Sequence, residues 1–403
     1  MRNQPSMFAI FAWIFCLFCS TALNLAQEKS PSMKKETKKE ATEPAIETSK
    51  EISDAMQALI KKHKLPGIVA GYQNIGGPLV VGVAGVRKTK TDEKMTVEDQ
   101  LHLGSCTKAI TATMIARLVD QKKLSWDMTI AEGLPSLHKK FDDAFHNVTL
   151  KQLLMHRGGV PKNAKDWWAH SKRPTVSDSR RKILIANLAK APKNKPGTYR
   201  YSNLGYTVVA LMAAKATGKS WEKLIRKEIF KPLDLKTAGF GPPGTKGKSD
   251  QPWGHISLGK MVVAQQIDNP PAFGPAGRIH MSMADWAKFC LEHARTPQEE
   301  DKDKGEQDKD SNQSHQFISD ESLKILHQTL DGATGEGAEY ALGWNVLEQS
   351  WGGRVFAHSG SNTTWFATVW VSPRNGTVYM AATNAGTSDH IDGAINDLSL
   401  IHI

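Results

Sequence analysis

The stretch Leu103-Gly104-Ser105-Cys106-Thr107-Lys108 leads directly into an apolar run. From Ala109 to Val119 small and apolar residues recur at steps of three and four, which predicts a buried helix. Ser105 therefore lies at the mouth of a helix, where free N–H groups favour a developing alkoxide. Lys108 lies three positions on, so its amine can reach the same face. The pair is either a nucleophile with its base or a helix cap beside an unrelated lysine, and partners elsewhere must decide.

The composition is that of an ordinary globular protein. Of 403 residues 40% are hydrophobic, and the formal net charge is +11. The basic residues are scattered or in small groups such as Arg180-Arg181-Lys182, which argues against a nucleic-acid footprint. We therefore expect a monomer that acts on a small molecule or peptide and binds no nucleic acid.

The first 26 residues have the pattern of a signal peptide. Arg2 precedes an apolar block, Met7–Phe18, that is too short for a comfortable membrane span, and small residues follow it up to Ala26. We expect export to the periplasm or the extracellular space. The alternative is an uncleaved anchor that tethers the chain to a membrane. Residues 27–50 are polar and charged, which predicts a flexible linker.

Beyond the signal peptide only Cys106 and Cys290 remain, and we expect two separate buried thiols. No Cys/His spacing resembles a zinc site, so no metal is expected. Gly241–Ser249 resembles a phosphate-binding loop, but five residues instead of four separate its first glycine from Gly-Lys-Ser. No cofactor is expected.

Strand patterns occur at both ends of the remaining domain, residues 51–403, and helical patterns dominate residues 124–324. This predicts an α/β (α+β) fold in which an antiparallel sheet, built from both chain ends and flanked by helices, carries a mostly helical insert. A charged stretch over residues 296–316 predicts a disordered loop. The expected terminal elements are a helix over Glu51–Lys64, strands over Ile68–Tyr72, Leu79–Val86, Tyr340–Glu348, Arg354–His358, Trp365–Val371 and Gly376–Asn384, and a helix over Ile391–Ile403.

Two further motifs could complete the site. Tyr201 and Asn203 lie two residues apart on a turn before a helix predicted to begin near Gly205. The sequence His358-Ser359-Gly360-Ser361 ends a predicted strand, where glycine lets a substrate backbone approach. Either motif alone would carry little weight.

The order Ser-x-x-Lys, Tyr-x-Asn and basic residue-Ser-Gly resembles that of the serine β-lactamase and penicillin-binding protein family. The chain is most similar to the branch of class C β-lactamases, D-Ala-D-Ala carboxypeptidases and related esterases. The resemblance runs from about Ile52 to the C-terminal end and implies a β-lactamase/transpeptidase-like fold. Other segments that resemble the family are Leu153–Gly159, Pro232–Thr237, Gly274–Gly277 and Thr383–Gly386.

The chemistry fits these residues. Ser105 would form an acyl-enzyme, and the N–H groups of Ser105 and Ser361 would form the oxyanion hole. Lys108 starts from a pKa near ~10.4, so it can act as a base at neutral pH only if burial lowers that value. The residues alone leave open whether Lys108 or Tyr201 takes the serine proton; the resemblance favours Tyr201, with Lys108 as its electrostatic partner.

The same resemblance assigns the substrate contacts to Asn203, which would hold the amide oxygen, and to His358, Ser359 and Gly360. Class C enzymes have lysine where this chain has His358. Since histidine titrates near ~6.5, we expect His358 to be partly charged and to hold a substrate carboxylate weakly.

The function expected is therefore an exported serine hydrolase acting on β-lactams or D-amino-acid peptide amides, such as peptidoglycan peptides. The alternatives are an esterase of the same family and a penicillin-binding sensor that is acylated but turns over poorly.

Overall fold

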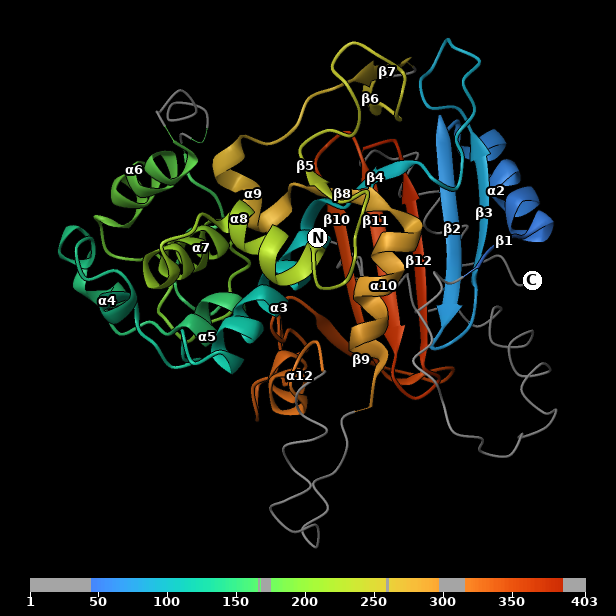
Figure 1. Ribbon diagram of the computed structural model, residues 1–403. Helices are drawn as coiled ribbons and strands as arrows, with labels where there is room; N and C mark the ends of the chain where they lie inside the picture. The colour runs from blue at the N-terminus through green and yellow to red at the C-terminus, as the bar shows by residue number, and fades with distance from the viewer. Residues whose placement is uncertain (1–44, 166, 168–174, 259–260, 297–315, 387–403) are drawn as a thin grey trace, which may run out of the picture.

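The computed structural model describes residues 45–165, 167, 175–258, 261–296 and 316–386. Its largest element is a seven-stranded sheet with the order β1-β3-β2-β12-β11-β10-β9 (Figure 1). Every neighbouring pair is antiparallel except β1 and β3. The predicted sheet from both chain ends is confirmed. Its strands are β1 (Ile46–Thr48), β2 (Gly67–Asn74), β3 (Leu79–Gly85), β9 (Asn345–Gln349), β10 (Gly353–Ser361), β11 (Phe366–Ser372) and β12 (Thr377–Thr383).

Alternating side chains give the sheet two apolar faces. In β2, Val69 packs in the large core that includes α10 (Met283–Ala294), whereas Ile68 and Ala70 pack against α2 (Lys50–His63). Figure 1 shows α10 lying across the sheet and α2 beside β3. The helix predicted over Glu51–Lys64 is confirmed.

A helical region lies beside the sheet, with α3 between the two (Figure 1). Helix α3 is buried over most of its length, as predicted. Thr149 caps α5 through a capping box, and Ser202 and Ser220 cap α7 and α8. The helices here are α3 (Thr107–Asp120), α4 (Ile130–Gly133), α5 (Leu150–Leu154), α6 (Val176–Leu188), α7 (Asn203–Thr217) and α8 (Trp221–Ile225); α9 (Gly274–Gly277) and α12 (Asp320–Leu326) follow.

The predicted helical character of residues 124–324 is wrong in one part. Strands β5 (Gly239–Phe240), β6 (Gly254–Leu258), β7 (Met261–Gln265) and β8 (Ile279–Ser282) lie within it, and β8 also pairs with β4 (Gln100–His102). These strands have two to five residues, so any alternating pattern in them is short. Strand β8 also pairs with segments far along the chain, β4 and β5, whereas β6 and β7 pair with each other.

Two other boundaries differ from the prediction. The linker predicted over residues 27–50 is wrong at its end, because Ile46–Thr48 pairs with β3 as strand β1 and Ser49 caps α2. The strand predicted from Tyr340 begins at Asn345, because the chain turns back at Gly343, where φ is +83°. Cys106 and Cys290 are free and buried, as predicted.

Some predictions lie outside the described residues: the signal peptide over 1–26, most of the linker, most of the charged loop over 296–316, and the helix over Ile391–Ile403. Within the described ranges, no helix has the length and apolar character needed to cross a bilayer.

Candidate active site

Ser105 lies in a short 3-10 helix, η2 (Gly104–Cys106), that continues directly into α3. Gly104 has a φ of +49°, and a Cβ there would lie 2.4 Å from the backbone nitrogen of Ser361. Glycine is therefore required by both the backbone conformation and the close approach of a second chain segment. The nucleophile predicted at the mouth of a helix is in that position.

Lys108 points from α3 to the serine. Its side chain is 0% exposed, and Nζ lies 3.0 Å from the Ser105 Oγ and 2.8 Å from the carbonyl oxygen of Ala276. No carboxylate in the described part of the chain forms an ion pair with it. Burial therefore lowers the pKa of Lys108 well below its ordinary value. A neutral amine can accept a proton from the serine hydroxyl.

Tyr201 reaches the same hydroxyl from the loop before α7. Burial raises the pKa of its phenol, although a hydrogen bond with Ser105 opposes this rise. The Lys108 Nζ lies 4.8 Å from the centre of the Tyr201 ring, and the centre of the His156 ring lies 4.2 Å from the same point. His156 is itself fixed by the Ser202 N–H, which donates to its Nδ1. These pKa directions favour Lys108 as the proton acceptor and Tyr201 as a protonated donor, the reverse of the assignment that the resemblance implied.

Strand β10 brings the third motif to the serine. A Cβ on Gly360 would lie 2.1 Å from the carbonyl oxygen of Leu103 and 2.4 Å from the backbone nitrogen of Ser105. Only glycine allows these backbones to come so close. The backbone N–H groups of Ser105 and Ser361 are therefore held beside one another, as an oxyanion hole requires.

The charge expected on His358 is contradicted. The side chain is 3% exposed, its Nδ1 lies 2.7 Å from the Ser359 carbonyl oxygen and its Nε2 lies 3.1 Å from the Tyr340 hydroxyl. Because a carbonyl only accepts, Nδ1 carries the proton and Nε2 accepts from the phenol. Burial and the nearby Lys108 lower the pKa of His358 to about 3. The imidazole is neutral at pH 7 and is no cation for a carboxylate.

These groups line a cavity of about 280 Å³. Aromatic rings form much of its wall, and among the described residues no side chain that is charged at neutral pH lines it. Four residues of the wall were not predicted from the sequence: Tyr199, Tyr340, Asn345 and Phe366. Only Tyr199 could have been suspected, because it lies two residues before Tyr201. The predicted residues in the wall are Ser105, Tyr201, His358, Ser359, Gly360 and Ser361.

Asn203 does not line this cavity. It is the first residue of α7, and its Nδ2 donates to Asn163 over 2.8 Å. Its buried Oδ1 has no hydrogen-bond partner within the described ranges. A contact between Asn203 and the substrate amide stays a prediction. Among the described residues, no group of three or more His, Cys, Asp and Glu could hold a metal ion.

A serine with a buried amine, a phenol and two backbone N–H groups around it is the site of a serine hydrolase. A family model described as Beta-lactamase matches residues 52–401, and the chain belongs to this family.

Known proteins agree with this assignment. Penicillin-binding protein 4 of Amycolatopsis lactamdurans is 23% identical over 354 residues, which cover 83% of this chain and 85% of that protein. A mutant class C β-lactamase superposes with a TM-score of 0.68 at 18% identity over 88% of this chain and 97% of the other. The D-amino acid amidase from Ochrobactrum anthropi SV3, solved with L-phenylalanine amide, superposes with a TM-score of 0.67. Its sequence is 19% identical, and the match covers 87% of this chain and 97% of the amidase.

Proposed function

We propose that this enzyme hydrolyses amides or esters of D-amino acids, or the related β-lactam amide, through an acyl ester on Ser105. The observation that carries the proposal is the 3.0 Å contact between the Ser105 Oγ and a fully buried amine with a lowered pKa. In the first step Lys108 takes the hydroxyl proton while Oγ bonds to the substrate carbonyl carbon. The N–H groups of Ser105 and Ser361 stabilise the oxyanion.

The leaving group departs next. The Tyr201 phenol lies beside Ser105 and is protonated at neutral pH, so it can donate to the leaving nitrogen or oxygen. The proton held by Lys108 then returns to the phenolate. Water then attacks the carbonyl carbon of the acyl ester and gives a proton to Lys108. That proton passes to the Oγ as the ester bond breaks, so Ser105 leaves as the alcohol. Each turnover consumes one water and restores both side chains.

The cavity favours substrates without a free carboxylate beside the scissile bond. His358 is neutral, and the other wall residues are aromatic or uncharged. A carboxylate placed there would lose its hydration without gaining a cation. We therefore place amides and esters of D-amino acids with an apolar side chain ahead of peptides that end in D-alanine. The fold shared with a D-amino acid amidase supports this order.

Steady-state kinetics test the substrate class. D-phenylalanine amide, its L-enantiomer, D-phenylalanine p-nitrophenyl ester and a peptide ending in D-Ala-D-Ala are compared with wild type and Ser105→Ala. We expect a higher kcat/KM for the D-amide and the ester than for the peptide, and no turnover by the variant. A peptide turned over faster than both would contradict the substrate class. An adduct that forms and is never released would support the sensor alternative.

Export is part of the same proposal and is supported by the sequence pattern of residues 1–26. N-terminal sequencing of the protein recovered from its native cells tests it. We expect a mature chain that begins near residue 27, outside the cytosol. A full-length chain in the cytosol would contradict export.

A further inference from the structure

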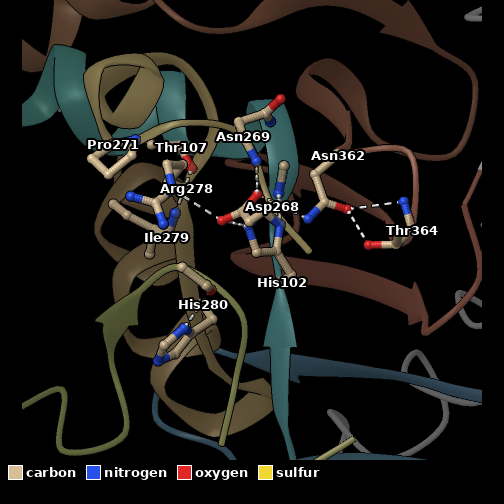
Figure 2. Close-up of polar contacts among 12 residues, drawn as sticks. His102, Thr107, Asp268, Asn269, Pro271, Arg278, Ile279, His280, Asn362 and Thr364 are labelled. Atoms are coloured by element: carbon tan, nitrogen blue, oxygen red, sulfur yellow. Dashed lines mark hydrogen bonds and ion pairs between the residues drawn. The ribbon is translucent and has the colours of Figure 1, made fainter. Parts of the chain in front are cut away.

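Asp268 is a buried carboxylate close to the active site that the proposed reaction does not use. Its side chain is 2% exposed and accepts four hydrogen bonds (Figure 2). The Oδ2 contacts the His102 Nε2 and the Arg278 Nε, both at 3.1 Å. The Oδ1 contacts the Asn362 Nδ2 at 3.0 Å and the backbone N–H of Asn269 at 2.7 Å. Each of the two carboxylate oxygens therefore accepts two hydrogen bonds.

Through His102 this network reaches the nucleophile. The backbone N–H of Gly104, the residue before Ser105, donates to the His102 Nδ1 over 3.1 Å. Because that nitrogen accepts, the His102 proton is on Nε2 and is donated to Asp268. Asp268 therefore fixes the imidazole that holds the backbone immediately before the serine.

Through Asn362 the network reaches the other side of the oxyanion hole. Asn362 follows Ser361 directly, and its Oδ1 accepts from the N–H and the hydroxyl of Thr364, so both ends of its amide are held. Figure 2 shows Asp268 between His102 and Asn362. The segment that carries Asp268 continues to Ala276, whose carbonyl accepts from Lys108.

We propose that Asp268 is a positioning residue that sets the distance between the two oxyanion-hole N–H groups, acting through His102 on Ser105 and through Asn362 on Ser361. The inference rests on the proposed acyl-Ser105 reaction. A single carboxylate can do this because its two oxygens hold the two chain segments from opposite sides. Against the effect of burial, His102, Arg278 and Asn362 lower the pKa of this carboxyl to about 2, so it is ionised at neutral pH and both oxygens remain acceptors.

The variant Asp268→Asn keeps the shape but turns one of the two acceptor oxygens into a donor. That group then faces donors, so at least one of the two segments is released. We expect kcat to fall about tenfold to a hundredfold, because small displacements of oxyanion donors cost this much. KM should stay within about twofold, since the aromatic side chains of the cavity wall are unchanged.

A phenylboronic acid distinguishes positioning from general damage to the fold. Its boron bonds to the Ser105 Oγ while the hydroxyl proton passes to the base, and an oxygen of the tetrahedral adduct occupies the oxyanion hole. We expect the affinity of Asp268→Asn for this probe to fall by the same factor as kcat/KM. A partly unfolded sample would lose binding sites, but the remaining sites would keep their affinity.

Asp99→Asn is the matched control. Asp99 is also buried and also accepts from an arginine, Arg87, and from a backbone N–H, that of Thr96. In the part of the chain that the structure describes, its side chain forms no hydrogen bond with His102, Gly104 or Ser105. We expect this variant to lower stability and to leave kcat and boronate affinity within about twofold. An unchanged boronate affinity in Asp268→Asn, or an equal loss in both variants, would overturn the inference.

Should Asp268→Asn not fold, Asn362→Ala decides by the same measurement. Of the four hydrogen bonds to Asp268 it removes only the one from Asn362, and it also removes the oxygen that accepts from Thr364. We expect the same parallel loss of kcat/KM and boronate affinity, and wild-type values would overturn the inference. A wild-type enzyme that forms no boronate adduct would instead overturn the proposed acyl-Ser105 reaction.

Discussion

The proposed acylation of Ser105 depends on the buried amine of Lys108. In water a lysine amine is protonated at neutral pH, and a protonated amine cannot accept the serine proton. Burial without a carboxylate partner makes the charged form costly, and a hydroxyl and a carbonyl remain to hold the neutral amine. We therefore expect this position to lower the stability of the fold while it supplies the proposed base.

Lys108→Met should remove the base and stabilise the fold. We expect kcat to fall about 10³-fold, as for other general bases, and the free energy of unfolding to rise near neutral pH. The folded pKa of Lys108 is lowered, so between that value and about 10.4 the unfolded chain binds the extra proton and wild-type stability increases with pH. The stability advantage of the variant should therefore shrink as the pH rises towards 10. Urea unfolding at several pH values measures it.

Lys108→Arg is the control for this prediction. It keeps a cation that stays protonated in proteins, so it should lack activity and should not gain stability. Activity within tenfold of wild type in either variant would contradict a neutral lysine as the base.

His358 should not appear in the pH profile near neutrality. With a pKa of about 3, the imidazole stays uncharged from pH 5 to 8. The ratio of kcat/KM for a carboxylate-bearing substrate to that for its amide should therefore be flat over this range. A ratio that falls with rising pH near 6.5 would indicate a histidine cation that holds the carboxylate.

At the scale of the elements, the site depends on β10 lying directly against η2. Gly360 and Gly104 face each other's segments at distances that leave no room for a Cβ. This contact brings Ser361 to the serine across more than 250 residues of chain. Packing of a strand end on a helix start, with glycine on both sides, therefore brings together the two N–H groups of the proposed oxyanion hole.

Gly360→Ala should separate these two segments. The new Cβ would meet backbone atoms, which cannot move aside as a flexible side chain can. We expect about 1–3 kcal/mol of destabilisation and a fall in kcat of about a hundredfold or more. Gly77→Ala, in the β2–β3 turn where the nearest atoms are 3.5 Å from the added Cβ, is the control that should keep full activity. Equal activities in the two variants would contradict the account.

The elements that the sequence predicted are those with a long or local signal. The periods of α2 and α3 can each be recognised within one segment, and Ser105, Lys108 and Tyr201 lie in motifs of three or four residues. Strands such as β4 and β8 could not be predicted, because they are short and pair over long distances. The neutrality of His358 and the acceptor role of Asp268 depend on burial by distant segments, which no local pattern records.

At the scale of the whole molecule, the Asp268 network connects the end of β10 to the segment before α9 and to residues 102–105. Burial alone would raise the pKa of this carboxyl, but His102, Arg278 and Asn362 hold it at about 2. A carboxyl with a lowered folded pKa stabilises the fold above the unfolded value near ~3.9. This stability is lost as the pH falls towards 2.

We therefore expect the stability difference between wild type and Asp268→Asn to be constant above about pH 4 and to shrink by about 2 kcal/mol as the pH falls to 2. Chemical unfolding at pH 2 to 6 measures it, with Asp99→Asn for comparison. A difference that does not change over this range would contradict an ionised Asp268 with a lowered pKa.

The central claim is that Ser105 becomes acylated. The most direct measurement is peptide mapping by mass spectrometry after the enzyme is quenched in acid during turnover of an activated D-phenylalanine ester. We expect the acyl mass on the peptide that contains Ser105 in wild type, and on no peptide in Ser105→Ala. An acyl group on another residue of the wild-type enzyme, or turnover with no acyl group at all, would contradict the account.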